Sequence, residues 1–85
     1  SNFLSQRESG AIIKYLMPNG PAEKGGLKVN DLIISINNKK ISTPADVVQE
    51  INKNNLRSTL KIKILRKNIE SIKYIKPIDI YDLQL

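Results

Sequence analysis

Two runs of alternating side chains near the C-terminus constrain the fold most. Over residues 59–66, isoleucine and leucine alternate with lysine, and over Ile69–Ile75 an alternating pattern resumes until Pro77 ends it. A period of two places successive side chains on opposite faces of a strand. Each run therefore predicts a strand with one wet face. The dipeptide Lys67-Asn68 between them predicts a tight turn, so the two runs form a hairpin.

Turn residues upstream of this hairpin mark out two further strands and two helices. Apolar, largely β-branched runs predict strands over residues 10–17 and 29–37. Proline at the first position predicts a short helix over Pro21–Lys24, which Gly25-Gly26 ends, and a longer helix over Pro44–Lys53. Strands joined by short turns, with two helices to one side, predict an α+β domain shaped as a small, partly open β-barrel or sandwich.

Missing residue types exclude most enzyme chemistry. The chain has no His and no Cys, so it cannot contain a Ser-His-Asp triad, a Cys-His pair or a His/Cys metal site. Its 8 acidic residues form no pair that stands out as a general acid and base. We therefore expect no catalytic residue, no metal and no cofactor, and we expect that this chain alone is not an enzyme. The absence of cysteine also leaves the redox compartment undefined.

The net charge of +6 raises the question of a nucleic-acid partner. The lysines are scattered, however, and many alternate with isoleucine, which is the pattern of a solvated sheet face. Aromatic residues make up only 5% of the chain and arginines do not cluster, so the stacking platform that single-stranded nucleic acids require is missing. We expect no nucleic-acid partner.

The length of 85 residues suits one domain with one modest core. We expect a single domain over residues 1–85, with its core over about 10–76 and a C-terminal extension over 77–85. Ser1 and Asn2 lack an initiator Met and fit the remnant of an expression tag. The chain therefore reads as a piece of a larger protein.

The run from Pro18 to Asn38, with the sequence PNGPAEKGGLKVNDLIISINN, resembles the signature of PDZ domains. It is most similar to the bacterial branch found in HtrA, DegP and DegS serine proteases. Asn30 stands where the family usually has Gly, and Asn tolerates the same left-handed backbone. Asp31 follows it at a loop-to-strand junction, where a carboxylate can accept backbone hydrogen bonds. The resemblance implies an α+β fold of about five strands and two helices.

PDZ domains bind an extended peptide as an added strand, between a strand edge and the longer helix. The resemblance therefore implies a peptide-binding groove in this chain. In the family a Gly-rich loop before the edge strand receives a terminal carboxylate, and the only candidate segment here, residues 2–5, contains no Gly. The residues assigned to peptide binding are Phe3, Leu4, Ser5 and Gln6 on the loop and strand, and Pro44, Val48 and Ile51 on the helix. Val48 and Ile51 fit plain core packing equally well.

The family resemblance implies a regulatory, substrate-recognition module of a bacterial protease, located in the periplasm or cell envelope. Its partners would be peptides or unfolded-protein C-termini with an apolar anchor, and its parent would be an HtrA-like serine protease, membrane-anchored or secreted, that acts in protein quality control. The alternative parents are a site-2 intramembrane metalloprotease, a C-terminal processing protease and a type II secretion subunit. The chain's last residue, Leu85, is itself ligand-like, which suggests self-association through the tail.

Overall fold

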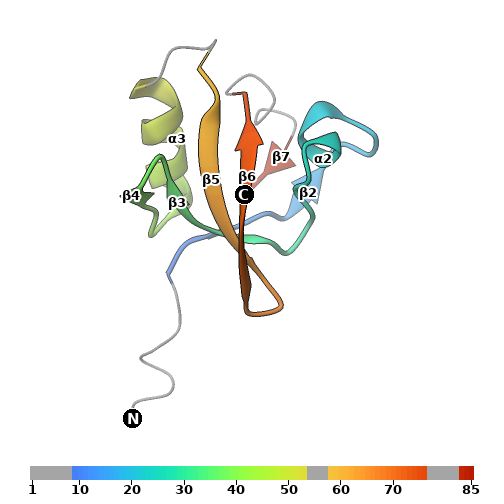
Figure 1. The fold of residues 1–85 in the computed structure, drawn as a ribbon, viewed down its shortest axis with the longest axis horizontal. Helices are drawn as coiled ribbons and strands as arrows, with labels where there is room; N and C mark the ends of the chain where they lie inside the picture. The colour runs from blue at the N-terminus through green and yellow to red at the C-terminus, as the bar shows by residue number, and fades with distance from the viewer. Residues whose placement is uncertain (1–8, 54–57, 77–82) are drawn as a thin grey trace.

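A computed structural model describes residues 9–53, 58–76 and 83–85. This part of the chain forms two helices and seven strands, whose arrangement is drawn in Figure 1. In chain order they are β1 (Ala11–Ile12), β2 (Tyr15–Leu16), α2 (Pro21–Lys24), β3 (Leu32–Ile36), β4 (Lys39–Lys40), α3 (Pro44–Lys53), β5 (Leu60–Arg66), β6 (Ile69–Ile75) and β7 (Leu83–Gln84).

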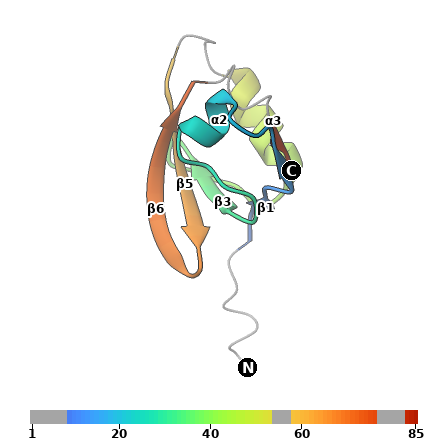
Figure 2. The same ribbon diagram turned by 90° about the vertical axis from the view of Figure 1, so that its right-hand side faces the viewer.

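The strands form two antiparallel sheets. The larger sheet has the order β1-β3-β5-β6, with β4 paired to β3, and the smaller one consists of β2 and β7. Figure 2 shows β5 and β6 as a curved layer on one side of the molecule, with β1 and α3 on the other side and α2 between them. The sheets do not close on each other. The predicted class, an α+β domain with a partly open barrel and two helices, is confirmed.

The predicted C-terminal hairpin is the longest regular feature. β5 pairs with β6 along its whole length, from Leu60 opposite Ile75 to Arg66 opposite Ile69. Lys67 and Asn68 both have positive φ angles, of 54° and 66°, as a two-residue type I′ turn requires. The same geometry joins β3 to β4.

The core lies between the sheet and the two helices and is almost entirely aliphatic. Its members are buried and come from every layer: Ala11, Ile13, Leu16, Ala22, Leu27, Ile33, Ile36, Ile41, Val47, Ile51, Leu60, Ile62, Ile64 and Ile75. Residues that alternate along β5 all point into this cluster, while the lysines between them are partly exposed. The wet sheet face that the alternation predicted is therefore present.

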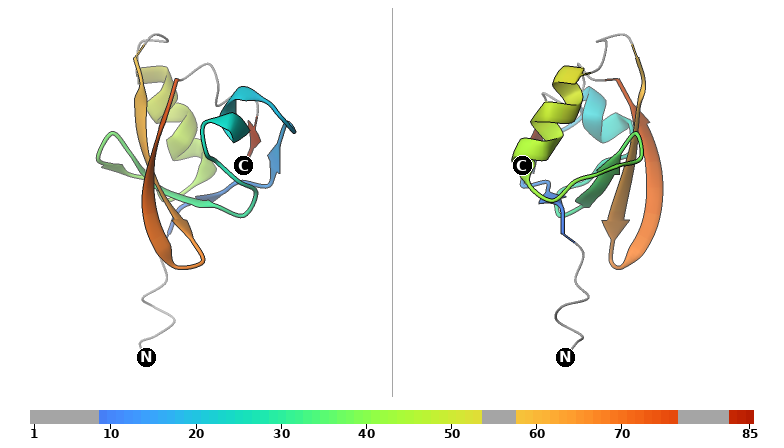
Figure 3. Two further views of the ribbon diagram at one scale, coloured as in Figure 1. Left: turned by 45° about the vertical axis from the view of Figure 1, so that its right-hand side comes forward. Right: turned by 90° about the vertical axis from the view of Figure 1, so that its left-hand side faces the viewer.

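Helix α3 begins at a reciprocal cap. The amide of Asp46 donates to the Thr43 hydroxyl at 3.3 Å, and the Asp46 carboxylate accepts from the amides of Ser42 and Thr43 at 2.8 and 3.1 Å. Pro44 occupies the first helical position, where its missing N–H costs nothing. This start fixes the direction of α3, which Figure 3 shows lying across the molecule opposite β6.

The first predicted strand is divided in two. Within residues 10–17 only Ala11–Ile12 (β1) and Tyr15–Leu16 (β2) are strands, and the chain changes partners at Ile13, whose amide donates to the Asp31 carbonyl at 2.9 Å. The next amide, that of Lys14, donates to the Gln84 carbonyl at 2.7 Å. The second predicted strand also begins later than expected, at Leu32, because Asn30 adopts a φ of 79° and turns the chain. Among the described helices, none is long and apolar enough to span a bilayer.

Candidate functional site

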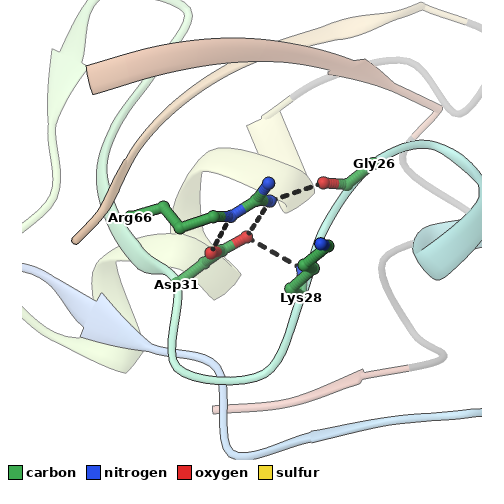
Figure 4. Close-up of polar contacts among 4 residues, drawn as sticks. All are labelled: Gly26, Lys28, Asp31 and Arg66. Atoms are coloured by element: carbon green, nitrogen blue, oxygen red, sulfur yellow. Dashed lines mark hydrogen bonds and ion pairs between the residues drawn. The ribbon is translucent and has the colours of Figure 1, made fainter. Parts of the chain in front are cut away.

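One end of the domain is held by an ion pair between Asp31 and Arg66. Figure 4 shows the Arg66 guanidinium meeting the carboxylate side-on: Nε donates to Oδ1 and Nη2 donates to Oδ2, both at 2.8 Å. Nη2 also donates to the Gly26 carbonyl at 2.7 Å, and Asp31 Oδ2 accepts from the Lys28 amide at 2.8 Å. The four groups tie the loop before β3 to the last residue of β5. We refer to them as the loop clamp.

The loop clamp is structural rather than reactive. The Asp31 side chain is 1% exposed, and a buried carboxylate is tolerated only when its oxygens are hydrogen-bonded and its charge is balanced. No buried side-chain polar atom among the described residues lacks a partner. The predicted role of Asp31, accepting a local backbone hydrogen, is confirmed by its contact with Lys28.

The hydrogen bond to Asp31 raises the pKa of Arg66 above its ordinary value. Burial opposes this rise in the pKa less strongly, and the negative charge of Asp31 adds the smallest contribution, in the raising direction. A raised pKa on a base contributes stability that is complete below its unfolded pKa and is lost only as the pH rises through the folded pKa. Because both values lie far above neutrality, Arg66 stays charged and the loop clamp does not switch through its deprotonation at physiological pH.

The predicted helix-side residues lie along one line of α3. Pro44, Val48 and Ile51 are spaced at i, i+4 and i+7, so they share one stripe of the helix. Ile51 is buried at 5% exposure, whereas Pro44 is exposed and Val48 is 53% exposed. Val47, one residue away from Val48, is buried in the core. The stripe therefore runs from the core to solvent and leaves an apolar side chain uncovered at its middle.

The strand β2 is covered along one edge by the last strand of the chain. β7 pairs with it, with Tyr15 opposite Gln84 and Leu16 opposite Leu83. Leu85, directly after β7, is partly buried and packs against the core cluster. In Figure 2, β7 lies in the same layer as α3, on the side of the molecule away from β6. A strand edge and a half-covered helix stripe thus occupy one layer.

The other predicted site residues, Phe3, Leu4, Ser5 and Gln6, lie outside the described residues. Sequence reasoning missed two participants. Arg66 was not predicted because it stands at the end of a strand of alternating residues. Its partner Asp31 is 35 positions away, and only knowledge of which strands pair could have brought the two together. The strand Leu83–Gln84 was not predicted, although the tail was singled out through Leu85, because two residues carry no periodicity. In the described part of the chain no group of three or more Asp, Glu, His or Cys is placed to hold a metal ion.

Comparison with known proteins gives this geometry a family. The PDZ domain model matches residues 12–66, which include the loop clamp, β3, α3 and β5. The solution structure of GtR34C from Geobacillus thermodenitrificans superposes with a TM-score of 0.71 over 92% of this chain and 93% of that one, at 18% sequence identity. At that identity the likeness establishes the fold.

Curated relatives are serine proteases. The chain is 37% identical over 75 residues to the serine protease Do-like HtrA of Bacillus subtilis, and 42% identical over 72 residues to the serine protease HTRA1A of Danio rerio. These alignments cover 87% and 85% of the chain but 17% and 14% of the two relatives. A probable periplasmic serine endoprotease of DegP type from Ectopseudomonas mendocina is 44% identical over 46 residues, 54% of the chain and 10% of the relative. The chain is thus similar to one segment of much longer proteins, and it belongs to the PDZ domain family.

Proposed function

We propose that this domain is the peptide-recognition module of an HtrA-like serine protease, whose catalytic residues would lie in another domain of the parent protein. Family membership supports peptide binding, and the curated relatives support a protease parent rather than the secretion subunit or metalloprotease. The module would capture unfolded or misfolded chain ends and pass that signal to the protease. A periplasmic or envelope location in a bacterium follows from the DegP-type relative and is part of the proposal.

The observation that carries the proposal is the exposure of Val48. A branched aliphatic side chain that stays 53% exposed, on a stripe whose next member Ile51 is buried, offers an apolar surface continuous with the core. An extended ligand lying along α3 could cover Val48 with an apolar side chain while its backbone pairs with a strand edge. Pro44 would extend the contact toward the start of the helix.

The opposite wall of the groove would come from Phe3, Leu4, Ser5 and Gln6. A ligand with an apolar anchor at or near its C-terminus fits this arrangement best. Lys14 and Lys53 are exposed, Lys53 as the last residue of α3, and would add weakly to the affinity for acidic ligand residues.

The test is a screen of C-terminal peptides on the whole chain, followed by titration of the best binder. Val48→Lys should weaken binding by about tenfold or more, because it places a charge where the apolar anchor rests. Gln49→Lys is the matched control: it adds the same charge at the neighbouring exposed position, and binding should not change. Equal affinities for the two variants, or no binding to any peptide with an apolar anchor, would refute the proposed groove.

A further inference from the structure

The larger sheet has one face that neither of the two described helices covers. In Figure 2 both α2 and α3 lie on the inner side of the curved layer formed by β5 and β6, together with the core. Side chains that alternate with the core residues therefore point to the outer side, where directly opposite residues on paired strands form rows. We call this surface the outer face; it carries Lys40, Lys61, Lys63, Glu70, Ile72 and Tyr74.

Two neighbouring rows of the outer face place an apolar side chain beside a lysine. Lys61 of β5 lies opposite Tyr74 of β6, and Lys63 lies opposite Ile72. Tyr74 is 65% exposed and Ile72 is 40% exposed, so both offer apolar surface to a partner. The two lysines are partly exposed, as is typical of a stem that packs on its neighbours while the ammonium group stays in water.

The row of Lys63 continues across the sheet to a hollow. Ser35 lies opposite Lys63 on one side and opposite Lys40 on the other. The register of β3 against β5 shifts between Ile33 and Ser35, and such a bulge re-aims the side chains around it. Next to the bulge is an open hollow of about 300 Å³, lined by Ile34, Ser35, Asn38, Lys40, Lys63 and Glu70. Two ammonium groups, a hydroxyl and an amide supply donors for an anion there.

Charge is distributed unevenly between the outer face and the rest of the described chain. The outer face carries three lysines against one carboxylate, that of Glu70. Lys63 Nζ lies 3.6 Å from Glu70 Oε2, and because both side chains are partly exposed this pair contributes little. The other acidic residues of the described ranges belong to the helices or to the loop clamp: Glu23, Asp31, Asp46 and Glu50. The outer face is therefore cationic and complements an anionic partner.

The residue types on the outer face favour a lipid surface over a folded acidic protein. Lysine is depleted and arginine enriched at protein–protein interfaces, and the cations of the outer face are lysines. A lysine stem lies along apolar material while its charge stays among headgroups, and tyrosine is enriched at the boundary between membrane and water. Anionic phospholipids form a diffuse negative surface that attracts each nearby lysine. A single exposed aromatic ring gives no stacking platform for a nucleic acid.

We propose that the outer face docks on a bilayer that contains anionic phospholipids. A headgroup phosphate sits between Lys40 and Lys63, and the Tyr74 ring lies at the boundary between headgroups and acyl chains. The carboxylate of Glu70 opposes this contact. Because α3 lies on the inner side of the sheet, docking leaves the proposed peptide groove uncovered. Docking does not depend on peptide binding, so either proposal can fail alone.

The first test is cosedimentation of the whole chain with vesicles of phosphatidylcholine alone and of equal parts of phosphatidylcholine and phosphatidylglycerol. The chain should bind only the anionic vesicles, and salt should weaken the binding because it shortens the Debye length. Lys40→Glu should weaken binding by about tenfold or more, because it turns an attracted charge into a repelled one. Lys24→Glu is the matched control: it makes the same change at an exposed position of α2 and should weaken binding by about twofold at most.

Glu70→Gln gives a change of the opposite sign on the same vesicles. It removes the one carboxylate of the outer face, so binding should strengthen by about fivefold. A loss of affinity in this variant would contradict the proposed contact.

The second test places a fluorescent reporter on the outer face. The chain contains no Trp, so Tyr74→Trp introduces a single one, and the indole ring suits the same membrane boundary. Its emission should shift to shorter wavelength when anionic vesicles are added, and lipids brominated in their acyl chains should quench it. Met17→Trp is the control at another exposed position, outside the larger sheet, and its emission should not change. Circular dichroism checks that each variant is folded.

Several results would overturn the inference. Equal sedimentation with the two kinds of vesicle, or equal losses in Lys40→Glu and Lys24→Glu, means that the outer face is not a docking surface for anionic lipid. An emission shift in Met17→Trp without one in Tyr74→Trp assigns the docking to another side of the domain. Binding of soluble polyglutamate that depends on Lys40, with no binding to anionic vesicles, assigns the outer face to an acidic protein.

An anisotropy titration with the best fluorescein-labelled library peptide separates this inference from the proposed function. Lys40→Glu should bind that peptide as tightly as the unaltered chain does, because Lys40 and α3 belong to different sides of the sheet. Peptide binding that depends on Val48, together with no docking on vesicles, refutes the inference and leaves the groove. Docking that depends on Lys40, together with no peptide binding, refutes the groove and leaves the inference.

Discussion

The loop clamp and the β2 edge are both built from hydrogen bonds, but they differ in what holds them. The loop clamp joins the loop before β3 to the end of β5 through a buried carboxylate with three donors at 2.8 Å. The β2 edge joins two-residue strands and is bordered by exposed apolar side chains, among them Tyr15 at 47%. One region is held by a buried carboxylate in an ion pair, and the other by two pairs of residues in short strands. The two regions are therefore expected to differ in how much each stabilises the fold.

Removing the carboxylate of the loop clamp should have the largest effect on the stability of the domain. Asp31→Ala leaves the Lys28 amide and Arg66 Nε without their partner, while Arg66 Nη2 keeps the Gly26 carbonyl. The variant should lose about 2–3 kcal/mol of unfolding free energy, since Arg66 can partly turn to water. Urea unfolding measures the loss. Arg66→Lys keeps the charge but not the side-on geometry, and should cost less. A change below about 0.5 kcal/mol for Asp31→Ala would show that the clamp does not hold the loop.

Two adjacent valines on α3 differ in burial, since Val47 lies in the core and Val48 is exposed. Val47→Ala opens a space in the core and should destabilise the domain by about 2 kcal/mol, whereas Val48→Ala should change its stability by less than about 0.5 kcal/mol. Peptide binding should follow the reverse order once the folded fraction is taken into account. Thermal unfolding and the anisotropy titration give the two rankings. If both variants lose stability equally, Val48 is an ordinary core residue and the groove argument fails.

The cap of α3 offers the smallest test. Thr43→Ala removes the hydroxyl that accepts from the Asp46 amide and should cost about 1 kcal/mol. Ser42→Ala is the control, since Ser42 takes part through its backbone amide. Because α3 carries Val48, fraying of its first turn should also weaken peptide binding slightly. A stable Thr43→Ala variant with unchanged helicity by circular dichroism would contradict this account.

Much of the fold was predictable because its signals are local. The alternation over β5 and β6 sets their faces, Pro44 and Asp46 set the start of α3, and asparagines mark the turns. The site was less predictable. Val48 and Ile51 look identical in a helical stripe, and their different exposure depends on how α3 lies on the sheet. Whether Phe3 to Gln6 bind a ligand stays a prediction, as does self-association through Leu85, which in the single chain packs against its own core.

The left-handed turns have a further consequence that concerns the unfolded chain. Within residues 9–53, 58–76 and 83–85, five of the six non-glycine residues with positive φ are asparagines: Asn19, Asn30, Asn37, Asn38 and Asn68. Glycine would adopt these angles with less strain, but it would give the denatured ensemble more backbone freedom to lose on folding. By closing its turns with asparagine, the chain trades local strain for a narrower unfolded state. With only 4 glycines in 85 residues, part of the stability arises from the lower conformational entropy of the unfolded chain and not from contacts in the folded domain.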